Sequence, residues 1–113
     1  MKQLLVTLDG KIRIKLTDIK YVEDCKKNLK LILYLEDNSK PIELQLAMDG
    51  IELELCSKGF CRIHKNYIVN FLYLKRINSD KLMLTDGTEL PIDKKKYSKI
   101  MLEYLKYGKV NNL

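Results

Sequence analysis

The run His64-Lys65-Asn66 places three side chains that can donate hydrogen bonds in the middle of an apolar, strand-like stretch. Phe60 and Ile63 precede it, and Ile68 and Val69 follow it, with the alternation typical of buried strands. Packing alone would favour an apolar or β-branched residue at this point, so we expect an exposed loop between two strands. A cation beside two hydrogen-bonding groups suits contact with a base edge next to a phosphate. The alternative is a histidine that only braces the turn.

A second candidate site is the run Lys94-Lys95-Lys96, which follows Asp93, a residue suited to the N-cap of a closing helix. The helix dipole is positive there, so each lysine costs roughly 0.3 to 1 kcal/mol. The cluster is understandable if an anion binds where free N–H groups and ammonium groups converge on one phosphate. A solvated lysine-rich surface without a partner is the alternative interpretation.

The net charge of +6 is distributed unevenly along the chain. Residues 55–79 carry +5 and contain no acid, residues 93–113 carry +4, and the remaining residues sum to −3. Basicity that served only solubility would mix the two signs. The segregation therefore favours a basic face that binds a polyanion.

Catalysis has little support in the sequence. The chain has one histidine, and it lacks a glycine-rich phosphate loop and a G-x-S-x-G motif. His64 could in principle activate Cys61, but residues three apart on a strand point to opposite faces. We expect no enzymatic activity and no cofactor.

The three cysteines, Cys25, Cys56 and Cys61, form no C-x-x-C pair, and we expect them to be reduced and packed as small apolar residues. A zinc site built from Cys56, Cys61 and His64, with Cys25 as a conceivable fourth ligand, is the alternative. Structural zinc sites usually show paired short spacings, which this set lacks.

The length of 113 residues fits one domain, residues 1–113, that is large enough to bury a core without disulfide bonds. No apolar run approaches the roughly 18 to 20 residues of a membrane span, and no signal peptide is visible. We therefore expect a cytoplasmic protein without membrane contact.

Alternating residues and turn signals predict a mainly antiparallel β fold with two short helices. Asp9-Gly10 and Asp86-Gly87 suit tight hairpin turns. Besides the strands that flank residues 64–66, the expected strands cover residues 4–8, 11–16, 19–23, 29–36, 42–46, 71–77, 81–85 and 88–92. The first helix should bury Met48, Ile51, Leu53 and Leu55 and end before Gly59. The closing helix should bury Tyr97, Ile100, Met101, Tyr104 and Leu105.

Four segments in unbroken order resemble the LytTR family, the DNA-binding output domain of many bacterial response regulators. Residues 60–70 read F-x-R-x-H-K-N-Y-I-V-N, which is similar to the family signature. Residues 17–23 resemble its D-I-x-Y-I-E strand, residues 48–55 its short leucine-rich helix, and residues 90–97 its L-P-I-S-R-R-x-Y ending. The resemblance covers roughly residues 4 to 107.

This resemblance implies elongated antiparallel β-sheets whose loops enter successive major grooves of double-stranded DNA and bend the duplex. It places base contacts at His64, Lys65 and Asn66, a C-terminal basic contact at Lys94, Lys95 and Lys96, and a first contact loop at Lys26, Lys27 and Asn28. Arg62 either braces the signature loop or meets a phosphate, whereas we expect Asn70 to hold backbone groups. Because lysine stands at positions 65, 94 and 95, where the family often has arginine, the resemblance implies phosphate binding more directly than base reading.

The resemblance further implies promoter DNA as the partner, with a possible homodimer on direct repeats. The receiver domain of such regulators is not expected within this sequence, which would be either a trimmed output domain or a stand-alone protein. A protein-interaction module that uses the basic face on an acidic partner is the alternative function. RNA binding is less favoured, because no aromatic pair for base stacking lies beside the basic tip.

Overall fold

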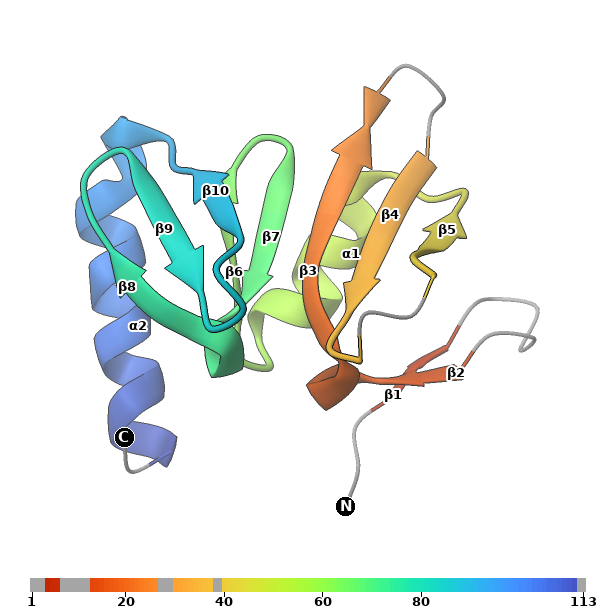
Figure 1. The fold of residues 1–113 in the computed structure, drawn as a ribbon, viewed down its shortest axis with the longest axis horizontal. Helices are drawn as coiled ribbons and strands as arrows, with labels where there is room; N and C mark the ends of the chain where they lie inside the picture. Colours follow the sequence, from red (N-terminus) through yellow and green to blue (C-terminus); the bar gives the residue numbers. More distant parts are fainter. Residues whose placement is uncertain (1–3, 7–12, 27–29, 38–39, 112–113) are drawn as a thin grey trace.

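The computed structural model describes residues 4–6, 13–26, 30–37 and 40–111 (Figure 1). The elements in chain order are β1 (Leu4–Val6), β2 (Arg13–Lys15), η1 (Leu16–Asp18), β3 (Ile19–Cys25), β4 (Lys30–Leu35), β5 (Ile42–Leu44), α1 (Met48–Cys56), β6 (Phe60–His64), β7 (Tyr67–Asn70), η3 (Phe71–Tyr73), β8 (Leu74–Ile77), β9 (Lys81–Leu84), β10 (Glu89–Pro91), η4 (Lys94–Lys96) and α2 (Tyr97–Asn111).

All the strand pairs of the described residues are antiparallel and form three sheets. The central sheet has the order β5-β4-β3-β7-β6, β1 pairs with β2, and a third sheet has the order β10-β9-β8. The prediction of a mainly antiparallel β fold with two helices is confirmed (Figure 1). No described helix has the length and apolar character needed to cross a membrane.

The β6–β7 hairpin separates two hydrophobic cores, and this explains its nearly continuous apolar sequence. Phe60 and Ile68 face the core beneath α1, whereas Ile63 and Val69 face the core between α2 and the third sheet. Neighbouring residues of a strand point to opposite faces, so both faces of this hairpin are buried. The hairpin is therefore anchored in both cores below its polar tip.

Each helix buries one stripe of side chains in a core, and this buried stripe is narrower than the sequence predicts. Met48, Ile51 and Leu55 of α1 are buried, but Leu53 is 83% exposed. On α2, Ile100 is buried, whereas Leu105 is 57% exposed. The two leucines fall outside the stripe because a helix packed on one sheet face buries only about 100° of its circumference. The predictions for Leu53 and Leu105 are therefore wrong.

The predicted strand over residues 71–77 is interrupted at its start. Residues Phe71–Tyr73 form the 3₁₀ turn η3, and the strand begins at Leu74. The cause is Asn70, whose side-chain oxygen accepts a hydrogen bond from Leu72 N at 3.0 Å. An asparagine that bonds the backbone two residues ahead favours a turn over an extended strand.

The turn of the β9–β10 hairpin is tied to the central sheet by an ion pair. Lys20 Nζ of β3 lies 2.6 Å from Asp86 Oδ2, and Lys20 is 7% exposed. Hydrogen bonds from Lys20 and from Thr88 N lower the pKa of Asp86 from 3.8 to about 2. A carboxyl whose pKa is lowered by folding stabilises the folded state above its ordinary pKa, and this contribution is lost as the pH falls.

We expect Asp86→Asn to reduce the free energy of unfolding by about 1 to 2 kcal/mol at pH 7, after allowance for solvent screening of the partly exposed carboxylate. The difference from the unchanged protein should shrink as the pH falls from about 4 to about 2, because protonation then removes the same charge. Urea unfolding at pH 7, 4 and 2 measures the difference in the free energy of unfolding between the two proteins. Asp80→Asn, at an exposed aspartate of the preceding turn, is the control. If Asp86→Asn lowers the free energy of unfolding by the same amount at all three pH values, the charge of Asp86 is not the cause of the stabilisation.

Candidate nucleic-acid interface

The tip of the β6–β7 hairpin is closed by the histidine itself. Asn66 N donates to His64 Nδ1 at 3.1 Å, so Nδ1 is unprotonated in this arrangement. In a neutral imidazole the remaining proton then lies on Nε2, which becomes a donor. His64 is half-buried against Tyr67, whose ring centroid is 5.8 Å away. The side chain thus braces the turn through one nitrogen and keeps a donor on the other.

Arg62 is engaged with protein groups. Its Nη1 donates to Asp49 Oδ1 and to Glu52 Oε1, each at 2.7 Å, and its Nη2 donates to the carbonyl of Lys65 at 2.7 Å. Burial alone would lower the pKa of Arg62, but the hydrogen bonds to Asp49 and Glu52 raise it above its usual value. Two roles were predicted for Arg62, bracing the signature loop or meeting a phosphate. These contacts are those of a brace for the loop.

Two backbone hydrogen bonds fix the tip to segments that are distant in the sequence. Asp24 N donates to Asn66 O at 2.8 Å, which extends the β3–β7 pairing by one residue beyond Glu23 and Tyr67. Asp93 N donates to Ile63 O at 2.8 Å, on the other side of the hairpin. The end of β3 and the start of η4 are therefore held on either side of the tip.

The three lysines before α2 form the 3₁₀ turn η4 rather than the first turn of the α-helix. Asp93 is the predicted cap, since its Oδ1 accepts from Lys95 N at 3.1 Å. Lys94 and Lys95 are exposed and Lys96 is half-buried. None of the three forms an ion pair with any residue that the structure describes. Their cationic groups are available to an anion from outside.

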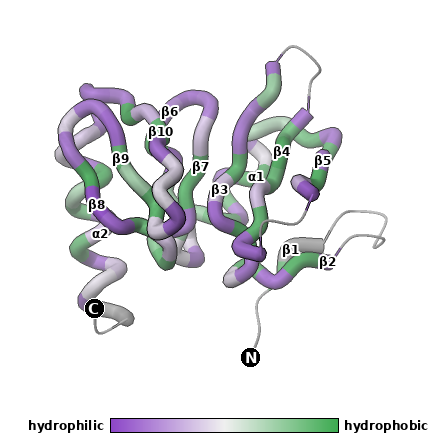
Figure 2. The backbone as a smooth tube through the Cα atoms, viewed as in Figure 1, coloured by the Kyte–Doolittle hydropathy of each residue, from purple (hydrophilic) through white to green (hydrophobic). Residues whose placement is uncertain are grey.

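The end of β3, the tip of the β6–β7 hairpin and the segment before α2 lie along one edge of the molecule, the upper edge of Figure 1. We call the residues Lys26, His64–Asn66 and Lys94–Lys96 of these segments the loop edge. Figure 2 shows hydrophilic residues at the hairpin tip and on the segment before α2. Lys26 directly follows β3 and is exposed. Lys27 and Asn28, which belong to the predicted first contact loop, lie outside the described residues.

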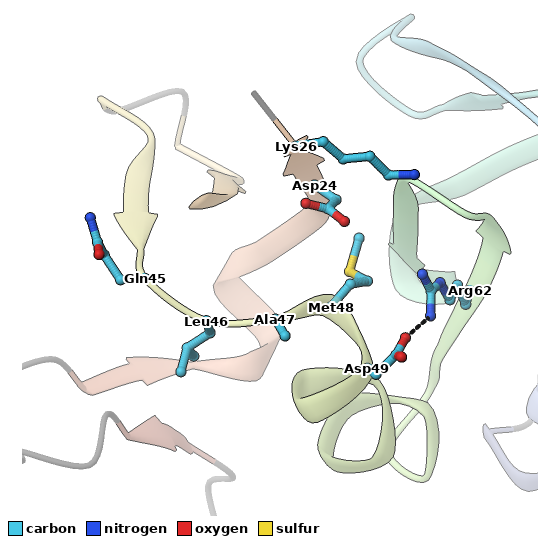
Figure 3. Close-up of a pocket in the computed structure, with 8 residues that line it drawn as sticks. All are labelled: Asp24, Lys26, Gln45, Leu46, Ala47, Met48, Asp49 and Arg62. Atoms are coloured by element: carbon cyan, nitrogen blue, oxygen red, sulfur yellow. Dashed lines mark hydrogen bonds and ion pairs between the residues drawn. The ribbon is translucent and has the colours of Figure 1, made fainter. Parts of the chain in front are cut away.

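A hollow of about 560 Å³ lies beside the loop edge, between the end of β3, the start of α1 and β6 (Figure 3). Its lining includes two cations, Lys26 and Arg62, and two acids, Asp24 and Asp49. In Figure 3, Asp49 pairs with Arg62, and Lys26 extends toward the hairpin. The opposite charges largely compensate each other here, so the positive charge of the loop edge comes from its outer lysines.

Asn66 is less accessible than the sequence predicts. Its side-chain Oδ1 is buried, and no described group donates a hydrogen bond to it. In this conformation Oδ1 is not available to a ligand. Reading adenine with an asparagine requires both the oxygen and the nitrogen, so that pairing would need the amide to turn.

Asn70 has the structural role predicted for it. It is 5% exposed, and its Nδ2 donates to Leu16 O at 3.3 Å and to Ile19 O at 2.9 Å. Together with the bond from Leu72 N, these contacts use both ends of the amide. Asn70 thus joins the end of β7 to the segment that leads into β3.

The cysteines show the properties of packed thiols. Burial raises the pKa of Cys56 to about 11 and that of Cys61 to about 12, so neither is a thiolate at neutral pH. Within the described ranges no group of three or more His, Cys, Asp or Glu side chains is arranged to hold a metal ion.

The loop edge offers cations and N–H donors for an anionic surface.

Asp49 and Glu52 are the partners that sequence reasoning missed. Both lie on α1, 13 and 10 residues before Arg62. Nothing in the sequence pairs them with Arg62, because the contact arises only when α1 packs beside β6. The acid content of residues 48–54 could have suggested a basic partner, but it could not identify which one.

The loop edge presents basic groups to an anionic partner, and the family comparison names a class of DNA-binding domains. The family model of the LytTr DNA-binding domain matches residues 9–104. This chain therefore belongs to the LytTr DNA-binding domain family. No curated protein matches it.

A similar solved structure is the LytTr DNA-binding domain of a protein described as a methyl-accepting/DNA response regulator from Bacillus cereus. The two share 23% sequence identity with a TM-score of 0.71, over 90% of this chain and 94% of that one. At this identity the likeness shows a common fold.

Proposed function

We propose that this chain binds double-stranded DNA sequence-specifically, as the output domain of a bacterial transcription regulator that acts in the cytoplasm. The observation that carries the proposal is the pair of backbone hydrogen bonds, from Asp24 to Asn66 and from Asp93 to Ile63. They hold three basic segments together on one edge. A duplex presents phosphates on both sides of its groove, so a polar tip flanked by cations matches it.

The apolar residues of the β6–β7 hairpin lie in the two cores and its tip lies outside them, and a turn that joins two strands about 5 Å apart is narrow enough to enter the major groove, which is about 12 Å wide. Lys94, Lys95 and Lys96 on one side of the tip, and Lys26 on the other, would meet phosphates. The proposed first contact loop also includes Lys27 and Asn28, which lie outside the described residues. His64 Nε2–H and Lys65 would donate to base acceptors such as guanine N7 and O6. Binding to paired half-sites of a direct repeat would bring two copies together.

We expect His64→Ala to reduce the preference for the target over random duplex by about tenfold, while the affinity for random duplex changes little, because a base contact and the brace of the tip are lost and no phosphate contact is. Fluorescence anisotropy with a selected target and a scrambled duplex, at two salt concentrations, measures both affinities. Leu102→Ala, at an exposed side chain of α2 outside the loop edge, serves as a control.

Binding of the unchanged protein should be salt-sensitive and should resist competitor DNA. Absence of DNA binding at low salt would refute the proposal and favour a module that binds an acidic protein through the same lysines. An equal loss for target and random duplex in His64→Ala would remove the base-reading role of His64 and leave the phosphate contacts.

A further inference from the structure

We propose that Asp49 and Glu52 of α1, acting through Arg62, position the hairpin tip for sequence reading. This inference rests on the proposed function. It makes Arg62 a positioning residue without a DNA contact of its own. It also assigns the N-terminal half of α1 a part in target preference, although no residue of α1 belongs to the loop edge.

The geometry of one guanidinium group carries the inference. Arg62 Nη1 is shared between Asp49 Oδ1 and Glu52 Oε1, and Nη2 reaches Lys65 O, with all three distances at 2.7 Å. A guanidinium is planar, so the two contacts of Nη1 with the carboxylates fix the direction in which Nη2 points at Lys65 O. The carbonyl of Lys65 is thereby held at a fixed place relative to α1.

Fixing that carbonyl fixes the side chains of the tip. The Lys65 carbonyl belongs to the peptide plane that joins Lys65 to Asn66, the N–H of that plane donates to His64 Nδ1 at 3.1 Å, and Asn66 O accepts from Asp24 N at 2.8 Å. The ladder between β6 and β7 has a register shift between Arg62 and His64, so regular strand pairing does not define the tip. The hydrogen bond from Arg62 Nη2 to Lys65 O therefore holds the tip in place where the pairing of β6 with β7 is irregular.

Stability does not account for Asp49, although it accounts in part for Glu52, which is 38% exposed and pairs with an Arg62 side chain that is 18% exposed. Asp49 is 90% exposed, and exposed ion pairs contribute little to stability. The helix is already anchored by Met48, Ile51 and Leu55, which are buried. Two carboxylates beside a DNA-binding edge also repel phosphates, and this favours a role in which their effect on Lys65 outweighs the repulsion.

The variant Asp49→Asn/Glu52→Gln separates positioning from charge, because the two explanations predict different outcomes. If only charge matters, loss of two negative charges raises the affinity for target and random duplex by the same factor. If the clamp positions the tip, the ratio of target affinity to random affinity falls. We expect that ratio to fall about tenfold, the scale of one well-placed base contact.

The matched control is Glu54→Gln/Glu89→Gln. It also removes two carboxylates that pair with basic side chains, Lys58 at 3.2 Å and Lys81 at 2.9 Å, but neither pair touches the tip. We expect the control to leave the affinity ratio unchanged. Thermal unfolding of both variants checks that the fold is kept.

Arg62→Lys is the second variant. An ammonium group keeps the charge but cannot reproduce the fixed fork to three acceptors. We expect the affinity ratio to fall about tenfold while the slope of log affinity against log salt stays unchanged.

An unchanged affinity ratio in both variants would overturn the inference, with the proposed function intact. A decrease of about 0.9 in the salt slope of Arg62→Lys would identify Arg62 as a phosphate contact and would also overturn it. Absence of DNA binding by the unchanged protein is a different result, since it refutes the proposed function itself.

Discussion

Replacement of Lys94, Lys95 and Lys96 together with alanine is expected to lower the affinity for any duplex by about a hundredfold at 0.15 M salt. Each lost phosphate contact should reduce the slope of log affinity against log salt by about 0.9, so the triple variant should lose about 2.7 and Lys95→Ala alone about 0.9. The fold should be kept or slightly stabilised, because the lysines have no described ion-pair partner and lie near the positive end of α2. Anisotropy titrations at several salt concentrations measure both quantities.

The control removes the same amount of charge elsewhere. Lys75, Lys106 and Lys109 are exposed and lie on β8 and on the second half of α2, outside the loop edge. Their joint replacement with alanine should change the affinity only through the net charge. If the two triple variants lose equal affinity and equal slope, the lysines of η4 act as general charge and the proposed phosphate contact there is wrong.

Asn70→Ala is expected to reduce the free energy of unfolding by about 3 to 5 kcal/mol, which is a large part of the total stability of a domain this size. The change leaves the carbonyl of Ile19 and the amide of Leu72 without their side-chain partner, in a place where Asn70 is 5% exposed, whereas Leu16 O keeps its hydrogen bond from Ile19 N. Each buried group without a partner costs about 1 to 3 kcal/mol. Urea unfolding measures the effect.

Leu72→Ala is the control for Asn70→Ala, since it alters the next turn at a side chain that is 47% exposed. Its cost should stay below about 1 kcal/mol. If Asn70→Ala costs no more than Leu72→Ala, the hydrogen bonds of Asn70 do not hold the junction between β7 and β3.

The strands and the positions of the basic segments were predictable because both follow from local sequence. Alternation, turn residues and the uneven charge of residues 55–79 and 93–113 need no knowledge of tertiary packing. The role of Asn70 was predictable for the same reason, because asparagine at the end of a strand commonly bonds nearby backbone.

Contacts across the chain were not predictable from these local signals. The pairing of Lys20 with Asp86 spans 66 residues and depends on how the third sheet meets β3. The choice between the two roles of Arg62 depends on where α1 packs. The burial of Asn66 Oδ1 depends on the shape of the closed turn, which composition does not determine. The predictions that Leu53 and Leu105 are buried are wrong for a related reason. The surface on which a helix packs sets how many of its side chains are buried.

The bonds from Asp24 to Asn66 and from Asp93 to Ile63 join main-chain atoms only. Replacement of a loop side chain by another non-proline residue leaves the atoms of these bonds in place. The same frame can therefore carry different residues at positions 65 and 94–96 and present them at unchanged spacing, while His64 still closes the tip. Divergence among promoters recognised by one scaffold, and deliberate retargeting in the laboratory, would then require changes at a few solvent-facing positions while the buried framework stays as it is.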